Sequence, residues 1–171
     1  MHAIRAKLGW VAAAWAIAGG VLLLAIVAVT TANIALFSAH RVAGLWGGGV
    51  AGLSGYEDFV RLAISCAALM CLPYCQLRRG HVAVDLFAER LGRLGTALGR
   101  VWDGLTAVLS LFLAGWMLRG LLETRADGVL TPILGWPEWP FYAPGLVSLV
   151  LWAGVASLQA AGAEPRTGST T

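Results

Sequence analysis

The stretch LGWVAAAWAIAGGVLLLAIVAVTTANIALF, residues 8–37, contains no charged side chain. As a helix, with a rise of about 1.5 Å per residue, it exceeds the ~30 Å hydrocarbon core of a bilayer and must tilt or protrude. Arg5 and Lys7 in front of it would also suit a signal peptide, but the apolar region of a signal peptide has only about 7–15 residues. We therefore expect a retained membrane-spanning helix over residues 8–37.

The rest of the chain has the same apolar character. Of its 171 residues, 58% are hydrophobic and 12% are charged, whereas about 25% of the residues in a soluble domain are charged. Three further apolar segments, at about 56–77, 101–122 and 142–161, are long enough to cross a bilayer. The sequence thus predicts an all-α membrane protein with four transmembrane helices in a single membrane domain, residues 1–171. No room is left for a soluble catalytic domain.

The connection between the second and third spans has a different pattern, over residues 82–99. Apolar and polar side chains recur there on opposite sides of a helix, every three or four residues. The apolar side carries Val84, Phe87, Leu91, Leu94 and Leu98, and the polar side carries Asp85, Glu89, Arg93, Thr96 and Arg100. We expect an amphipathic helix that lies along the membrane interface or docks on the helices of a partner, and the pattern does not separate these two alternatives.

The distribution of Lys and Arg predicts the orientation in the membrane, because basic residues concentrate on the cytoplasmic side. Eight lie in the N-terminal segment, the middle connection and the tail, and three lie in the other two loops. The first group is Arg5, Lys7, Arg78, Arg79, Arg90, Arg93, Arg100 and Arg166, and the second is Arg41, Arg119 and Arg125. We expect both termini in the cytoplasm.

Three charged residues open the second span. Glu57 and Asp58 precede Arg61 by four and three residues, a spacing at which side chains on a helix can pair. Arg61 lies inside the apolar region, where an unpaired charge is costly. We therefore expect Glu57, Asp58 and Arg61 to form a local charge cluster at the periplasmic end of the second span. Arg61 should pair with Glu57, with Asp58 or with a carboxylate elsewhere in the chain.

Small side chains in the spans are interpreted as packing residues. Cys66, Cys71 and Cys75 all lie in the second span, and an odd number of cysteines in an apolar run argues against a disulfide framework. Free cysteine is commonly a small buried apolar residue. Glycine and alanine let helices approach closely in membranes, and the first and fourth spans carry Gly19, Gly20, Ala153, Gly154 and Ala156.

The segment from Tyr56 to Phe87 resembles the small membrane subunit of the tripartite ATP-independent periplasmic (TRAP) transporters, the DctQ-like family. The similarity lies in Tyr56-Glu57-Asp58 with Arg61 one turn later, and in Arg79-Gly80-His81 followed by Asp85. Pro137 with Trp139, and Pro144-Gly145 at the start of the fourth span, also fit, so that the resemblance covers about residues 9–160. The cysteine-rich second half of the second span, with Pro73, departs from the bulkier residues common in the family.

This resemblance implies a passive role in transport. In the family a periplasmic binding protein delivers a substrate, often an organic acid anion, and a large membrane subunit carries it together with sodium ions. The small subunit is a tightly bound scaffold in the bilayer of the bacterial inner membrane. The basic residues are spread in ones and twos without a basic tract interleaved with aromatics, which argues against a nucleic-acid partner. No span has a charged residue near its middle, and we expect no catalytic residue, no cofactor, no metal and no substrate ligand in this chain. The candidates for structural or partner contacts are Glu57, Asp58, Arg61, Arg79, Gly80, His81, Asp85, Phe87 and Leu91.

The main alternative is the membrane anchor of a respiratory, haem-containing dehydrogenase complex. Such anchors place histidine ligands inside their spans, whereas His2, His40 and His81 lie at or outside the predicted span ends. A self-sufficient transporter would need a carboxylate near the middle of a span. A membrane enzyme would need His and Asp near a serine in a span, and the sequence shows no such arrangement.

Overall fold

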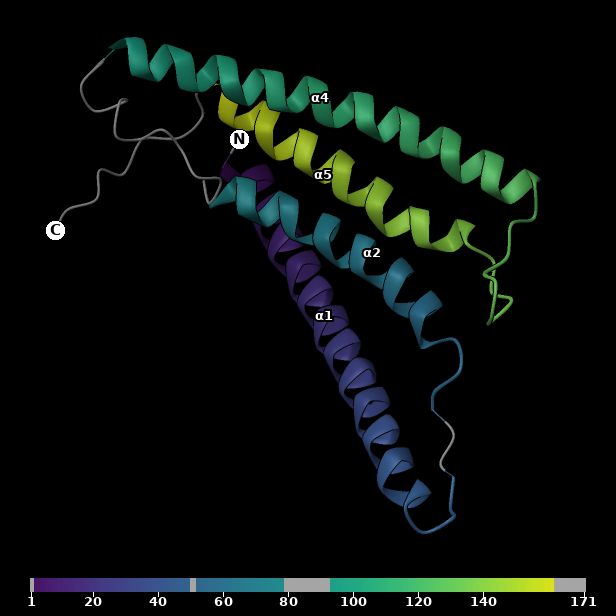
Figure 1. The fold of residues 1–171 in the computed structure, drawn as a ribbon. Coiled ribbons are helices and arrows are strands. Elements are labelled where there is room, and N and C mark those ends of the chain that lie inside the picture. Colours follow the sequence, from purple (N-terminus) through teal and green to yellow (C-terminus); the bar gives the residue numbers. More distant parts are fainter. Residues whose placement is uncertain (1, 50–51, 79–92, 162–171) are drawn as a thin grey trace, which may run out of the picture.

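Four helices of membrane-spanning length make up the structure, a computed structural model that describes residues 2–49, 52–78 and 93–161 (Figure 1). They are α1 (His2–Gly44), α2 (Tyr56–Leu77), α4 (Arg93–Ala126) and α5 (Tyr142–Ala160), with the short 3₁₀ helix η1 (Trp139–Phe141) leading into α5. Each of the four is long and apolar enough to cross a bilayer. The predicted all-α fold with four spans is confirmed.

Two of the helices have close to their predicted bounds, and two are longer. Residues 56–77 form α2 as predicted, and α5 ends one residue before 161. In contrast, α1 and α4 extend well beyond 8–37 and 101–122. Both continue until the chain reaches a glycine with a left-handed backbone, Gly47 (φ +76°) after α1 and Gly128 (φ +61°) after α4. Glycine in this conformation is a common end of a helix.

The amphipathic helix predicted over residues 82–99 falls partly within the described residues. Residues 93–99 belong to α4, which runs without interruption from Arg93 into the third span. Residues 82–92 lie outside the described residues. An interfacial helix over 82–92 therefore stays a prediction, and the helix that contains the third span begins earlier along the chain than its apolar residues indicated.

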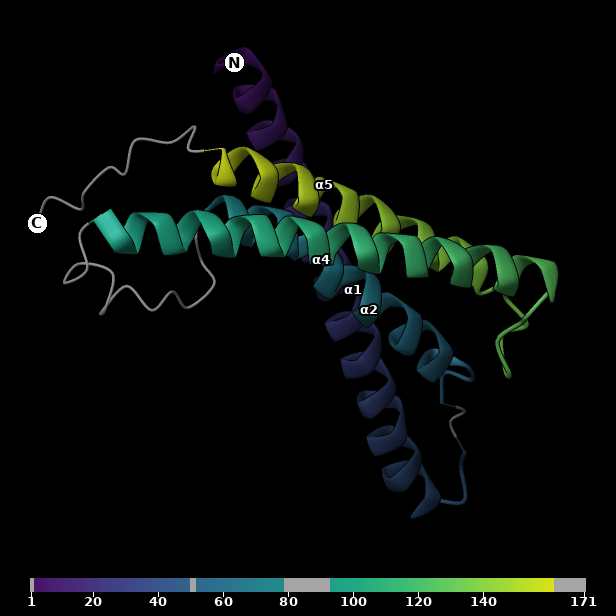
Figure 2. The same ribbon diagram turned by 90° about the horizontal axis from the view of Figure 1, so that it is seen from above.

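The helices are arranged in a row, in the order α4, α5, α2 and α1 (Figure 1). In Figure 2, which is seen from above, α4 lies over α2 and α1. In this row α5 packs between α4 and α2, and α2 packs between α5 and α1. The first helix lies against α2 and then diverges from the other three towards its C-terminal end (Figure 1). Because α1 and α4 stand at opposite ends of the row, they bury fewer of their apolar residues than the two central helices.

Small residues allow the central helices to approach one another. Gly145 of α5 lies against Leu69 of α2 and Met117 of α4, and a Cβ atom at this position would be 2.6 Å from the Met117 methyl group. Ala153 and Ala156 of α5 are buried. These positions agree with the predicted role of small residues in helix packing.

The crossing of α1 and α2 also depends on glycine. A Cβ atom at Gly19 would be 2.9 Å from Cβ of Met70 and 3.2 Å from the carbonyl oxygen of Ala67. Gly20 and Gly154, by contrast, have open space where a Cβ would lie. Of the small residues singled out in the sequence, these two glycines therefore make no close helix contact within the described structure.

Candidate functional site

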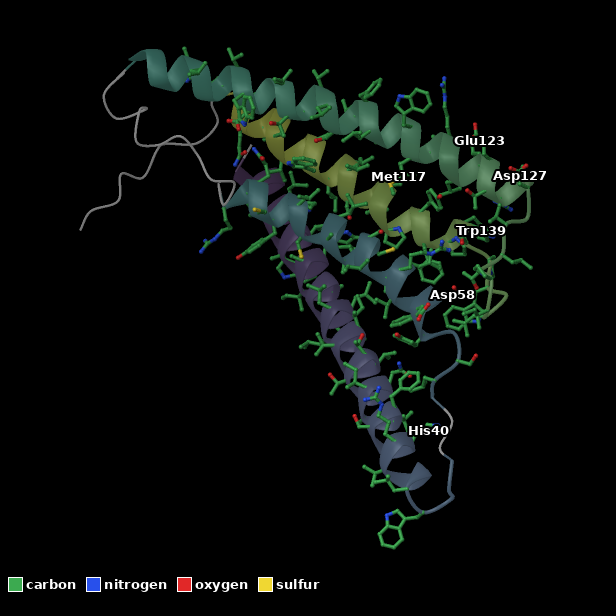
Figure 3. The ribbon with its side chains drawn as sticks, in the orientation of Figure 1. His40, Asp58, Met117, Glu123, Asp127 and Trp139 are labelled. Atoms are coloured by element: carbon green, nitrogen blue, oxygen red, sulfur yellow. The ribbon has the colours of Figure 1, made fainter. Side chains whose placement is uncertain are left out.

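The acidic start of α2 holds the loop that connects α4 to α5. Asp58, in the first turn of α2, is only 6% exposed. Its Oδ2 atom accepts hydrogen bonds from the backbone N–H groups of Ile133 (2.8 Å) and Leu134 (3.0 Å). Just before the helix, Gly55 has a φ of +84°, and Leu134 occupies the space where a side chain would be, so glycine suits this position doubly. Figure 3 shows Asp58 on the side of α2 that faces this loop.

The loop itself, residues 127–138, is tightly folded. The backbone N–H of Thr131 donates to the carbonyl oxygen of Trp136 (2.8 Å), and the N–H of Gly135 donates to that of Thr131 (3.1 Å). The Thr131 hydroxyl oxygen accepts a further bond from the N–H of Trp136 (3.0 Å). At its two ends, the N–H of Glu138 donates to the carbonyl oxygen of Val129 (3.1 Å). These internal bonds, together with Asp58, satisfy much of the loop backbone.

Arg61 forms an ion pair with Glu138, at the end of the same loop. The Arg61 side chain is 59% exposed and that of Glu138 is 18% exposed. The predicted partner of Arg61 was Glu57, Asp58 or a carboxylate elsewhere, and the structure shows the third possibility. Glu57 is exposed, and the Asp58 carboxylate is engaged by the loop backbone. The cluster at the start of α2 is therefore not local, because a loop about 75 residues away folds over it.

A second arginine, Arg125, contacts the 3₁₀ helix η1 that leads into α5. The guanidinium carbon of Arg125, at the end of α4, lies 5.1 Å from the ring centroid of Trp139 in η1. A cation above an indole ring is attracted by its π electrons. Trp139 and Asp58 thus mark the same end of the helix row (Figure 3).

A buried polar cluster lies at the opposite end of the row, where α2 stops. We call it the Gln76 junction, and it consists of Gln76 of α2, Asp103 of α4, and Trp152 and Gln159 of α5. The side chains of Gln76, Asp103 and Gln159 are at most 7% exposed. The Nε2 atom of Gln76 donates to Oδ1 of Asp103 (3.1 Å) and to Oε1 of Gln159 (2.8 Å). Its Oε1 atom accepts a bond from the indole N–H of Trp152 (3.2 Å).

None of the four residues of this junction was singled out from the sequence. The available signal was the presence of two glutamines inside apolar spans, where side-chain amides commonly bond across helices. The partners of Gln76, however, lie far from it along the chain: Asp103 is 27 residues away and Gln159 is 83 residues away.

Two further hydrogen bonds fasten α1. The indole N–H of Trp15 donates to the hydroxyl oxygen of Ser148 in α5 (2.8 Å). Asn33 is 2% exposed, and its side-chain oxygen accepts a bond from the backbone N–H of Leu53 (3.1 Å). The first bond ties α1 to the row, and the second folds the chain after α1 back onto that helix.

The remaining predicted contact residues fall elsewhere. Arg79, Gly80, His81, Asp85, Phe87 and Leu91 lie outside the described residues, so their roles stay predictions. The three cysteines are free. Cys66 is buried, and its thiol donates to the carbonyl oxygen of Phe141 (3.0 Å), a contact that helps to seat the start of α5 on α2.

The chemistry available at these sites is that of hydrogen bonding between segments. Among the side chains that the structure describes, no group of His, Cys, Asp and Glu could hold a metal ion. Every buried side-chain nitrogen or oxygen among them has a hydrogen-bond partner. Of these buried polar groups, Asn33, Asp58, Gln76, Asp103 and Gln159 bond other segments of the chain, whereas the Ser110 hydroxyl bonds within its own helix.

Comparison with known proteins identifies a family for most of the chain. The model of the DctQ family, described as "Tripartite ATP-independent periplasmic transporters, DctQ component", matches residues 50–163. This range contains α2, α4, the loop and α5. No curated protein and no solved structure matches the chain. The family is a component of transporters and not of enzymes, and it lends no support to a respiratory anchor. The chain belongs to the DctQ family and is the small, multi-pass inner-membrane subunit of a TRAP transporter.

Proposed function

We propose that this subunit is the scaffold that holds the large transport subunit during sodium-coupled uptake of an organic acid anion, which a periplasmic binding protein delivers. The observation that carries the proposal is the use of polar side chains in the spans. Asp58, Gln76, Asp103 and Gln159 each bond another segment of this chain. Polar groups in membrane spans commonly line pathways for ions or substrates, but here they hold the protein together.

The outer face of α4 supports contact with lipid and with a membrane partner. Its exposed bulky residues recur every three or four positions and form a continuous apolar stripe: Trp102, Leu105, Leu109, Phe112 and Trp116. Arg119 lies over the Trp116 ring at 5.3 Å, a pairing suited to the polar boundary of a bilayer. This face can accept acyl chains or the helices of the large subunit.

The proposed orientation places both termini in the cytoplasm. The loop 127–138 and the start of α2 then face the periplasm, and the Gln76 junction lies towards the cytoplasm. The concentration of basic residues in the middle connection supports this orientation.

Reconstitution tests the scaffold role. Proteoliposomes that contain the large subunit, with or without this chain, are supplied with the binding protein loaded with a radiolabelled organic acid and with a sodium gradient. We expect uptake only when this chain is present. Calorimetry on the isolated chain should show no saturable binding of sodium or of the acid. Saturable, sodium-dependent binding of the acid by this chain would contradict the proposal.

The apolar stripe of the middle connection offers a second test. Replacing Phe87→Ser together with Leu91→Ser should release the chain from its partner or from the membrane interface and abolish uptake, because the stripe loses its apolar surface. The substrate affinity of the binding protein should be unchanged. Glu89→Ser, on the opposite side of the predicted helix, is the matched control. Normal co-purification and uptake of the double variant would show that the stripe has no such role.

A further inference from the structure

Gln76 has all its side-chain hydrogen-bonding groups engaged by two other helices. Its amide nitrogen donates once to Asp103 of α4 and once to Gln159 of α5, and its amide oxygen accepts from Trp152 of α5. Two donors and one acceptor are thus used at the same time.

The backbone at Gln76 is part of the same cluster. Gln76 lies in the last turn of α2, where carbonyl oxygens have no partner within the helix. The side-chain nitrogen of Gln159 donates to this carbonyl oxygen at 3.0 Å. The two glutamines therefore bond each other twice, once through their side chains and once through the end of α2.

The hydrogen bond from Gln76 to Asp103 joins α2 to α4, which lie on either side of α5. Because α5 packs between α2 and α4, these two helices lack direct backbone contact, yet Gln76 and Asp103 are both buried and meet at the end where α2 stops. Both side chains are at most 7% exposed, so little water can replace a lost hydrogen bond there and an unpaired amide or carboxylate is unfavourable. The bonds of such a network support one another.

We propose that the Gln76 junction is a conformational lock that holds α2, α4 and α5 as one rigid block at this end of the row. At the other end, Asp58 and Arg61 hold the loop independently of the junction. Opening the junction should therefore separate the helices at one end only. The competing account is that apolar packing around Gly145, between Leu69 and Met117, holds all three helices along their whole length.

Distance measurements between spin labels separate the two accounts. The full chain, with Cys66, Cys71 and Cys75 replaced by serine, is placed in lipid nanodiscs. One label pair, at the exposed positions Arg78 and Leu98, reports on the junction end, and a second, at Glu57 and Leu122, reports on the loop end. We expect Gln76→Leu to lengthen and broaden the distances between 78 and 98 and to leave those between 57 and 122 unchanged.

Three variants control for general effects. Ser110 is fully buried in α4, but its hydroxyl donates within its own helix to Thr106, so Ser110→Ala should change neither distance. Gln159→Leu should reproduce the effect of Gln76→Leu. Asp103→Asn retains an oxygen that can accept from Gln76 and should keep the end closed.

Thermal unfolding provides an independent readout. Each glutamine variant should lower the apparent Tm by about 5 °C, and the double variant by less than the sum, because both remove the same network. Unchanged distances between 78 and 98 in both glutamine variants would overturn the proposal in favour of apolar packing. So would an equal opening of both ends, or additive losses of Tm. None of these measurements requires the transport partners, so their failure would leave the scaffold role untouched.

Discussion

The Asp58 carboxylate bonds the backbone of a loop 75 residues away and not the arginine one turn later. Two N–H groups converge on a single oxygen, and bonds to an ionised acceptor are stronger than neutral ones. The carboxylate of Asp58 is itself buried, and these two bonds give it the partners that a buried charge needs. Arg61, which is largely exposed, reaches the loop through Glu138 instead.

Removal of the Asp58 acceptor should loosen the loop. We expect Asp58→Ala to lower the Tm of the purified subunit by roughly 5 °C, because two backbone donors lose their partner. Asp58→Asn, which keeps one acceptor oxygen, should have a smaller effect, and Glu57→Ala, at an exposed neighbour, should have little. Calorimetry or fluorescence-detected unfolding measures the shift. Equal Tm values for Asp58→Ala and Glu57→Ala would show that the loop is held by its internal bonds.

The ion pair between Arg61 and Glu138 predicts a result for assembly. Arg61→Ala should lower the yield of the complex with the large subunit more than Arg41→Ala, because it leaves the poorly exposed Glu138 without its cation. The exchange of Arg61→Glu with Glu138→Arg should restore part of the yield. Quantitative co-purification measures it, and small, equal effects of Arg61→Ala and Arg41→Ala would count against the pair.

Among the helices, the contact of α1 with α2 depends on one of two adjacent glycines. Gly19 faces Met70 and Ala67, whereas Gly20 has open space beside it. Gly19→Ala should destabilise the protein by about 1–3 kcal/mol, as overpacking does in a close contact. Gly20→Ala should be neutral or stabilising, because alanine favours the helix.

The two glycine variants differ by one position and carry the same added methyl group, so each controls for the other. Denaturation of the purified chain in mixed detergent micelles measures both. Equal stabilities of Gly19→Ala and Gly20→Ala would show that the close contact at Gly19 does not contribute to stability.

In the molecule as a whole, the outer faces of α1 and α4 are not covered by the other residues that the structure describes. In the most apolar part of α1 and of α4, the share of residues that are buried is about half of that in α2 and α5. Such a shape offers a large surface to lipid and to a membrane partner, in keeping with a subunit that works in a complex.

The proposed topology has a direct test. Reporter fusions after residues 45, 90, 130 and 168 should report periplasm, cytoplasm, periplasm and cytoplasm in turn, because the basic residues concentrate in the N-terminal segment, the middle connection and the tail. Each fusion serves as the control for its neighbours. A periplasmic signal at residue 90 would contradict the orientation.

Local patterns in the sequence were sufficient for the fold class, the four spans and the family. An apolar segment of about 20 residues is recognisable from its own composition, because the bilayer acts on each span separately. Residues 56–77 became α2 with the predicted bounds for this reason. The early start of α4 was less visible, because helical hydrogen bonds continue past the end of an apolar segment.

The partners of the buried polar residues depended on the three-dimensional arrangement. Gln76 meets Asp103 and Gln159 because α5 lies between α2 and α4 and brings three chain segments to one point. Asp58 meets Ile133 because the loop folds back over the start of α2. The order of helices in the row is set by the packing of their surfaces against one another. Helical periodicity shows that a residue can face a neighbour, but it does not show which neighbour is there.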